Sequence, residues 1–169
     1  MTMAREATVT LRSVEPADGP FLVALYASTR VTELAALTWD AATMRAFLAQ
    51  QFAAQAASWS TTFPDLDRLL VVVDGRRAGR LYVHRSPTLL HLVDIALLPA
   101  LRGRGIGSVL LDRLIAEADA VGIPTTLHVA RDNPARGLYE RFGFRAVAEE
   151  PFHIRMTRPA PTVSRGRDG

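Results

Sequence analysis

The chain has 169 residues, about half of them apolar, with 20 basic side chains against 17 acidic ones. All 20 basic residues are arginines, and the chain contains neither lysine nor cysteine. These absences exclude Schiff-base enzymes, Walker-type phosphate loops, thiolate nucleophiles, disulfides and cysteine-bound zinc. The net charge of +3 permits anionic ligands without indicating a nucleic-acid partner.

The length suits a single domain. The N-terminal residues lack the apolar segment of a secretion signal, and no stretch is apolar and long enough to span a membrane. We therefore expect a soluble cytoplasmic protein with no membrane partner.

The pattern of apolar residues predicts the elements in chain order. Alternation or short β-branched runs predict strands at residues 8–14, 69–73, 78–84, 89–98, 125–130, 145–148 and 152–157. Helical spacing predicts helices at residues 18–30, from the cap Thr38 to 58, from Gly107 to Gly122 and from the cap Asn133 to Phe142. The tail, residues 159–169, is rich in Pro, Gly and Arg and is expected to be disordered.

The predicted order is β-α-α-β-β-β-α-β-α-β-β. The turn dipeptide Asp74-Gly75 indicates an antiparallel hairpin, and the strand-helix-strand over 89–130 indicates a parallel crossover. We expect an α/β fold with a mixed sheet and helices on both faces, forming one domain over residues 1–158.

A glycine-rich turn, with glycines at 103, 105 and 107, joins a predicted strand to a predicted helix. Small residues let the backbone approach a ligand, and the unpaired N–H groups of a helix N-terminus attract phosphate. The dinucleotide fingerprint G-x-G-x-x-G is not matched, because Ser108 occupies its last position. The glycines alone fit an ordinary tight turn equally well.

The wider segment over 94–111 resembles the acetyl-CoA motif of the GNAT superfamily of N-acetyltransferases, Q/R-x-x-G-x-G/A, with Arg102, Gly105 and Gly107 at the defined positions. The segment over 133–144 resembles the superfamily's later motif, N-x-A-x-x-L-Y-E-x-x-G-F. Both motifs stand in the superfamily's order. The resemblance implies the single-domain GNAT fold and acetyl-CoA as cosubstrate.

The resemblance also implies how the chain would hold acetyl-CoA. The amides over 103–108 would bind the pyrophosphate, and the backbone over 95–97 would pair with the pantetheine arm like an added strand. Asn133 would contact that arm, although an Asn-Pro helix start explains Asn133 as well. The implied cofactor-binding residues are Ile95, Ala96, Leu97, Arg102, Gly103, Arg104, Gly105, Ile106, Gly107, Ser108 and Asn133.

The reaction needs few side chains, because a neutral amine can attack the acetyl thioester directly. Tyr139 would face the sulfur and donate a hydrogen bond, since full proton transfer from a phenol (pKa about 10) to a thiolate (about 8.5) is uphill by about 2 kcal/mol. Asp94 is the candidate base, as several members that acetylate small amines carry an acidic residue there. The alternative is that Asp94 pairs with an arginine and only shapes the sheet.

The resemblance implies that Glu33, Trp39 and Tyr26 lie where superfamily members shape the acceptor pocket, and His91, a polar residue of the central strand, is a further candidate. Glu33 could hold an ammonium group or be a solvated loop carboxylate, and His91 is as well explained as an ordinary strand residue. The four histidines have no metal-ligand spacing, so no metal is expected.

The predicted function is transfer of acetyl from acetyl-CoA to a primary amine of a small molecule, peptide or protein. The alternative is a GNAT-fold module that binds acyl-CoA as a sensor or binds a partner without turnover. No nucleic-acid-reading motif is present, and a homodimer is possible through the apolar early helices and the late strands.

Overall fold

The structure is a computed structural model that describes residues 7–162. Its strands are β1 (Val9–Ser13), β2 (Leu66–Val73), β3 (Arg76–Ser86), β4 (Leu89–Leu97), β5 (Thr125–Ala130), β6 (Arg145–Glu149) and β7 (His153–Arg158). Its helices are α1 (Gly19–Leu34), α2 (Ala41–Thr62), α3 (Ile106–Val121) and α4 (Arg136–Arg141), with short 3-10 turns at Pro16–Asp18 and Pro99–Leu101. Of the expected tail, residues 163–169 lie outside the described residues.

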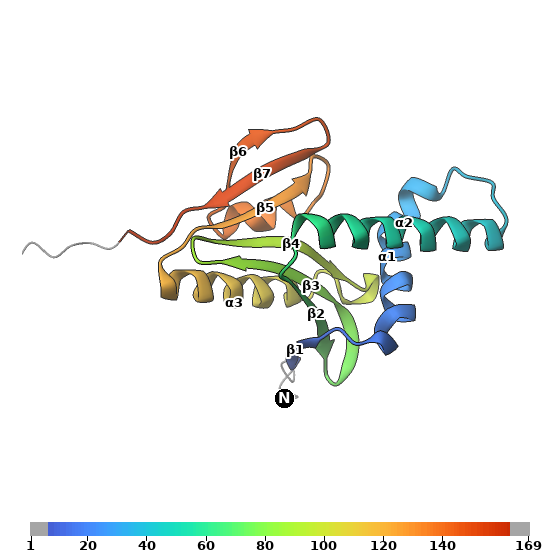
Figure 1. Ribbon diagram of the computed structural model, residues 1–169, viewed down its shortest axis with the longest axis horizontal. Coiled ribbons are helices and arrows are strands. Elements are labelled where there is room, and N and C mark those ends of the chain that lie inside the picture. Colours follow the sequence, from blue (N-terminus) through green and yellow to red (C-terminus); the bar gives the residue numbers. More distant parts are fainter. Residues whose placement is uncertain (1–6, 163–169) are drawn as a thin grey trace, which may run out of the picture. The chain divides into compact units, whose positions relative to one another are not determined.

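The strands form one sheet in the order β1-β2-β3-β4-β5-β7-β6 (Figure 1). Strand β2 pairs with β1 and with β3, and both pairs are antiparallel. Strands β4 and β5 are parallel, and β7 pairs antiparallel with both β5 and β6. The predicted mixed α/β sheet is therefore confirmed. None of the helices within residues 7–162 combines the length and apolar character needed to cross a membrane.

The chain divides into two compact units. The first contains the residues up to His84 together with Asp94–Gly107, and the second contains Arg85–Val93 and the residues from Ser108 onward. Strand β4 contributes its first half to the second unit and its last residues to the first.

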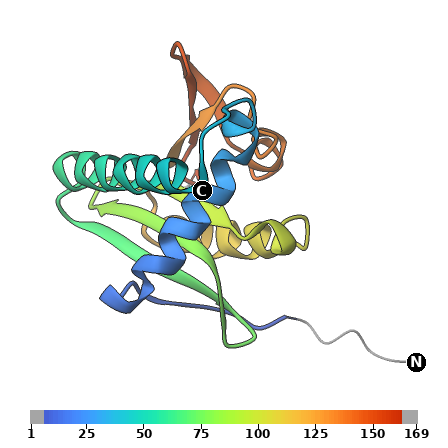
Figure 2. The same cartoon turned by 90° about the vertical axis from the view of Figure 1, so that its right-hand side faces the viewer.

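The core of the first unit lies where α1 packs on the sheet. Leu22 and Leu25 of α1 contact Leu70 of β2, and Phe52 of α2 packs against the same cluster. Both views show α2 running steeply across α1 (Figures 1 and 2). Each fully buried leucine contributes about 1.5–3 kcal/mol through removal of its side chain from water.

Turn and cap residues account for several boundaries. The predicted hairpin is confirmed: Asp74 and Gly75 both have positive φ, 49° and 77°, as a two-residue type I′ turn requires. The expected cap Thr38 is wrong, because the Asp40 carboxylate accepts from the amides of Ala42 and Thr43 at 2.9 and 3.0 Å. Helix α2 therefore begins at residue 41.

The second unit packs α3 with the strands β5, β6 and β7. Leu110 and Leu114 of α3 and Met156 of β7 are buried. Arg158 of β7 donates two hydrogen bonds to Asp119 of α3, at 2.6 and 3.0 Å. Helix α3 ends before Gly122, whose φ of 71° suits the predicted glycine stop.

The predicted start of the last helix at Asn133 is wrong by two residues. Asn133 Oδ1 accepts from the amide of Ala135 at 2.9 Å, forming a turn before the helix proper. Helix α4 begins only at Arg136, with Ala135 at the N-cap position.

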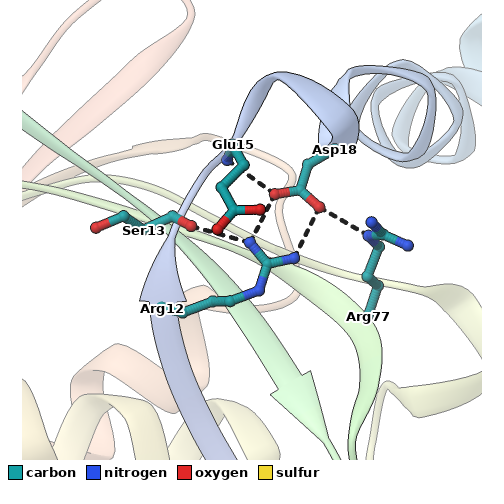
Figure 3. Close-up of polar contacts among 5 residues, drawn as sticks. All are labelled: Arg12, Ser13, Glu15, Asp18 and Arg77. Atoms are coloured by element: carbon teal, nitrogen blue, oxygen red, sulfur yellow. Dashed lines mark hydrogen bonds and ion pairs between the residues drawn. The ribbon is translucent and has the colours of Figure 1, made fainter.

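A buried carboxylate joins β1, β3 and the start of α1 in the first unit (Figure 3). Asp18 is fully buried and accepts from Arg12 Nη1 and Nη2 at 2.7 and 2.8 Å, from Arg77 Nε at 2.7 Å and from the amide of Glu15 at 2.9 Å. These four contacts use all the lone-pair positions of the carboxylate. The Arg12 guanidinium, the Glu15 amide and Arg77 together hold the pKa of Asp18 far below its usual range.

This network predicts an acid-dependent loss of stability. A carboxylate whose pKa is lowered by folding stabilises the fold above its unfolded pKa of about 3.9, and that contribution disappears as the pH falls through the lower folded value. The difference in unfolding free energy between the wild type and Asp18→Asn should be largest near about pH 6 and should shrink below about pH 4 in urea titrations. Asp65→Asn, which removes an exposed carboxylate, is the control. A difference independent of pH would contradict the network's role.

Candidate active site

Strands β3 and β4 approach each other unusually closely at Gly79. The amide of Leu98 donates to the carbonyl of Ala78 at 2.9 Å. A Cβ on Gly79 would collide with the carbonyl oxygen of Ala96 and lie 3.1 Å from Leu97 Cα. Position 79 must therefore be glycine for the last residues of β4 to keep this path.

The loop after β4 is open and rich in left-handed backbone. Gly103 and Gly105 have φ of 71° and 80°, and a Cβ on either would meet no atom within 4 Å. Glycine is thus required there by backbone conformation rather than by packing. Arg104 is exposed, and Arg102 Nε donates to the carbonyl of Leu97 at 3.0 Å, which ties the loop to β4.

Helix α3 begins immediately after this loop, at Ile106. The first amides of a helix have no acceptor within the helix and point along its axis toward the N-terminus. Gly107 and Ser108, which follow in the first turn, are half-buried. A strand, an exposed glycine loop and a helix N-terminus in succession form a suitable site for a phosphate group.

Asp94 of β4 lies beside Arg80, a buried arginine of β3. Arg80 Nε donates to Asp94 Oδ2 at 2.6 Å, and the side chains are 3% and 24% exposed. Gln55 of α2 accepts from Arg80 Nη2 at 3.2 Å, while Arg80 Nη1 has no hydrogen-bond partner among the described residues. Burial raises the pKa of the Asp94 carboxyl above its ordinary range, although the charge of Arg80 offsets part of that rise.

Two aromatic rings hold the Arg80 guanidinium. Its Cζ lies 5.3 Å from the centroid of Trp59 and 5.2 Å from that of Tyr82, and these rings contact each other edge-on. A cation over the face of an aromatic ring is attracted by the negative π density of that ring. Asp94 therefore faces a rigidly held positive charge. This ion pair is the arrangement that the alternative interpretation of Asp94 predicts, and it also orients the carboxylate that a base would need.

The residues of the first unit that were predicted to line the acceptor pocket differ in their exposure to solvent. Glu33 is exposed in the last turn of α1 and pairs with Arg30 at 2.8 Å. Trp39 is 44% exposed and contacts Phe47 edge-on. Tyr26 is instead buried in the core, with its ring 5.8 Å from that of Phe52.

The second unit carries the remaining predicted residues. His91 is buried, and its Nδ1 lies 2.7 Å from the hydroxyl of Thr126. Tyr139 of α4 is 6% exposed and packs edge-on against Phe144. Within residues 7–162 no group of three potential ligands could hold a metal ion.

Sequence reasoning missed Gly79 and Arg80. Polar and apolar residues hardly alternate over residues 78–83, a pattern typical of an apolar strand that is interrupted by a glycine and an arginine. A charge inside such a run requires a buried partner, and a glycine there indicates close backbone approach. Those two signals could have identified β3 as the support of β4.

A family model described as "Acetyltransferase (GNAT) family" matches residues 30–144, which is more than half of the chain. The chain belongs to the GNAT family of acetyltransferases. The predicted superfamily is therefore confirmed, and the loop at 102–107 and α3 lie within the matched region.

Individual GNAT proteins are also similar to this chain. The [ribosomal protein bS18]-alanine N-acetyltransferase of Haemophilus influenzae is 44% identical over 57 residues, which cover 33% of this chain and 39% of that protein. The chain thus matches only about two fifths of the length of this relative.

Solved GNAT structures share the fold at low sequence identity. The PaiA N-acetyltransferase of Thermoplasma acidophilum, solved in complex with coenzyme A, has a TM-score of 0.67 and 16% identity, covering 90% of this chain and 99% of that one. The ribosomal-protein-S18-alanine N-acetyltransferase of Escherichia coli has a TM-score of 0.61 and 22% identity, covering 94% of this chain and 98% of that one.

The ion pair between Arg80 and Asp94 leads to a stability prediction. Asp94→Asn leaves the buried guanidinium without a counter-charge, so the free energy of unfolding should fall by about 3 kcal/mol. Asp65→Asn, at an exposed carboxylate in the same unit, should change it by less than about 0.5 kcal/mol. Urea denaturation measures both, and equal values for the two variants would contradict a structural role for the pair.

Proposed function

We propose that this chain transfers an acetyl group from acetyl-CoA to a primary amine, with residues 1–158 acting as one domain. The observation that carries the proposal is the open loop at Gly103 and Gly105, held in left-handed backbone directly before α3. That loop offers amide donors to a pyrophosphate without side chains in the way. Membership of the GNAT family supports the same conclusion.

The residues present fit coenzyme A. The amides over 103–108 bind the pyrophosphate, and the exposed guanidinium of Arg104 can reach a phosphate oxygen. The backbone over 95–97 pairs with the pantetheine arm, because Gly79 lets β4 follow a path that a larger residue would block. Arg102 positions the carbonyl of Leu97.

Acetyl-CoA, when bound, supplies an acetyl group already activated as a thioester. Asp94 accepts the proton of the incoming ammonium group, directly or through water, and its raised pKa makes it a better base than an exposed carboxylate. Tyr139 donates a hydrogen bond to the sulfur, a role that rests on the later motif. The side-chain oxygen of Asn133 accepts a hydrogen bond from the amide of Ala135, so its side-chain nitrogen is the atom that would contact the pantetheine arm.

The acceptor is a primary amine. Two alanine N-acetyltransferases of ribosomal protein S18 are among the proteins similar to this chain, so a peptide with an N-terminal alanine is the first acceptor to test. Glu33 and Trp39, both accessible near the end of α1, are candidates to contact it.

The direct test is release of free thiol from acetyl-CoA with a panel of amines, covering the alanine peptide, other peptide N-termini and alkyl diamines. Thiol release that depends on one acceptor class supports the proposal. Binding of coenzyme A with no release for any amine would instead favour the acyl-CoA sensor.

The phenol of Tyr139 provides the first prediction for activity. Tyr139→Phe removes only the hydroxyl, so kcat should fall about tenfold to a hundredfold through loss of one hydrogen bond to a developing charge. Affinity for coenzyme A should stay near that of the wild type. An unchanged kcat would remove Tyr139 from the mechanism.

Gly79, which lies against the last residues of β4, provides a second prediction, which concerns the affinity for coenzyme A. Gly79→Ala forces the backbone of Ala96 and Leu97 aside, so the affinity for coenzyme A measured by calorimetry should fall about tenfold or more. Gly19→Ala is the matched control, because Gly19 has helical φ and ψ and no atom within 4 Å of a Cβ. Equal affinities for the two variants would show that the pantetheine arm does not follow β4.

A further inference from the structure

A hollow lies in the first unit, and Asp94 is not among the residues that line it. Its volume is about 770 Å³, and it is lined by Thr10, Arg12, Phe21, Val72, Gly75, Arg76, Arg77 and Leu98. Thr10 pairs with Val72 and Val72 with Arg77 across β1, β2 and β3. Paired residues of adjacent strands point to the same face of a sheet, so these side chains form one row.

Three arginines line this hollow, and only part of their donor groups is used by Asp18 and the carbonyl of Ser13. The Asp18 carboxylate behind it already accepts four hydrogen bonds and can take no more (Figure 3). Arg77 uses only Nε on Asp18, so its two terminal nitrogens remain, and Arg76 makes no ion pair within residues 7–162. Asp18 thus orients Arg12 and Arg77 while leaving donors available.

Two other carboxylates lie nearby. Glu15 is next to Arg12, and Asp74 accepts from the amide of Thr8 at the end of the hairpin. Neither lines the hollow. The carboxylates of Asp18, Glu15 and Asp74 lie around the hollow, while the lining residues include three arginines and no acidic residue.

The floor of the hollow is apolar. Phe21, Val72 and Leu98 are only partly buried and form the edge of the cluster around Leu22 and Leu25. An inorganic anion would leave these surfaces in water, whereas a ligand with an apolar body would cover them.

This hollow is separate from Asp94, the proposed base, although its lining residue Leu98 directly follows the segment 95–97 proposed for the pantetheine arm. Leu98 and Asp94 are four residues apart in extended backbone, so they lie about 13 Å from each other on the same face. Ala96, packed against the core cluster, stands between them.

We propose that this hollow binds a small amphipathic anion, in which a carboxylate or phosphate meets Arg76 and Arg77 and an apolar body covers Phe21, Val72 and Leu98. The paired terminal nitrogens of arginine match the oxygens of such an anion. The site does not depend on acetyl transfer.

Calorimetric titration with phenyl phosphate, benzoate, inorganic phosphate and benzyl alcohol tests the proposal. Each titration is run with and without saturating coenzyme A, so that binding at the glycine loop is separated. Phenyl phosphate or benzoate should bind about tenfold more tightly than inorganic phosphate or benzyl alcohol, because only they match both parts of the site. Coenzyme A should leave this binding unchanged.

Arg76→Gln should weaken binding of phenyl phosphate about tenfold. The side chain of Arg76 makes no ion pair or hydrogen bond within residues 7–162, so the variant should fold normally. Arg45→Gln, at an exposed arginine of α2, removes the same charge elsewhere and should bind like the wild type. No binding to the wild type, equal weakening by both variants, equal affinity for inorganic phosphate, or displacement by coenzyme A would each overturn the proposal.

Discussion

The close approach of β3 to β4 is the constraint on which the candidate site depends. Gly79 gives the carbonyl of Ala96 the space it needs, and the next residue, Arg80, holds the carboxylate of Asp94. Two consecutive residues of β3 therefore set the backbone path and a side-chain orientation of β4. The glycine loop follows this segment directly and is tied back to it through Arg102 and Leu97. Changes in β3 should thus affect both the backbone segment proposed to bind acetyl-CoA and the proposed base, Asp94.

The chain organises its buried charge entirely through arginine. Arg80 lies between two rings and one carboxylate, Arg12 meets Asp18 through two nitrogens, and Arg158 meets Asp119 in the same way. A planar guanidinium can stack on rings and donate in a fork, which an ammonium group cannot. The absence of lysine is therefore compatible with an ordered interior, because these contacts require the shape of arginine as well as its charge.

Much of the fold follows from local signals. The strand at Thr125–Ala130 was predicted to the residue, and the Asp74-Gly75 hairpin and the Gly122 stop were also correct. Errors arose where two local signals competed, as when Asp40 rather than Thr38 capped α2. The partner of Asp94 lies fourteen residues away on another strand, and the aromatic residue Trp59 farther still. Such pairs depend on strand register, which periodicity alone does not specify.

The contact between Arg80 and the ring of Trp59 has a spectroscopic consequence. The chain has two tryptophans, and one of them, Trp59, contacts the guanidinium that neutralises Asp94. The emission of an indole responds to charges beside its ring. With Trp39 replaced by phenylalanine, the tryptophan fluorescence of the chain would come from Trp59 alone. The protein thus carries its own optical probe of the charge on the candidate base, readable in solution without a label.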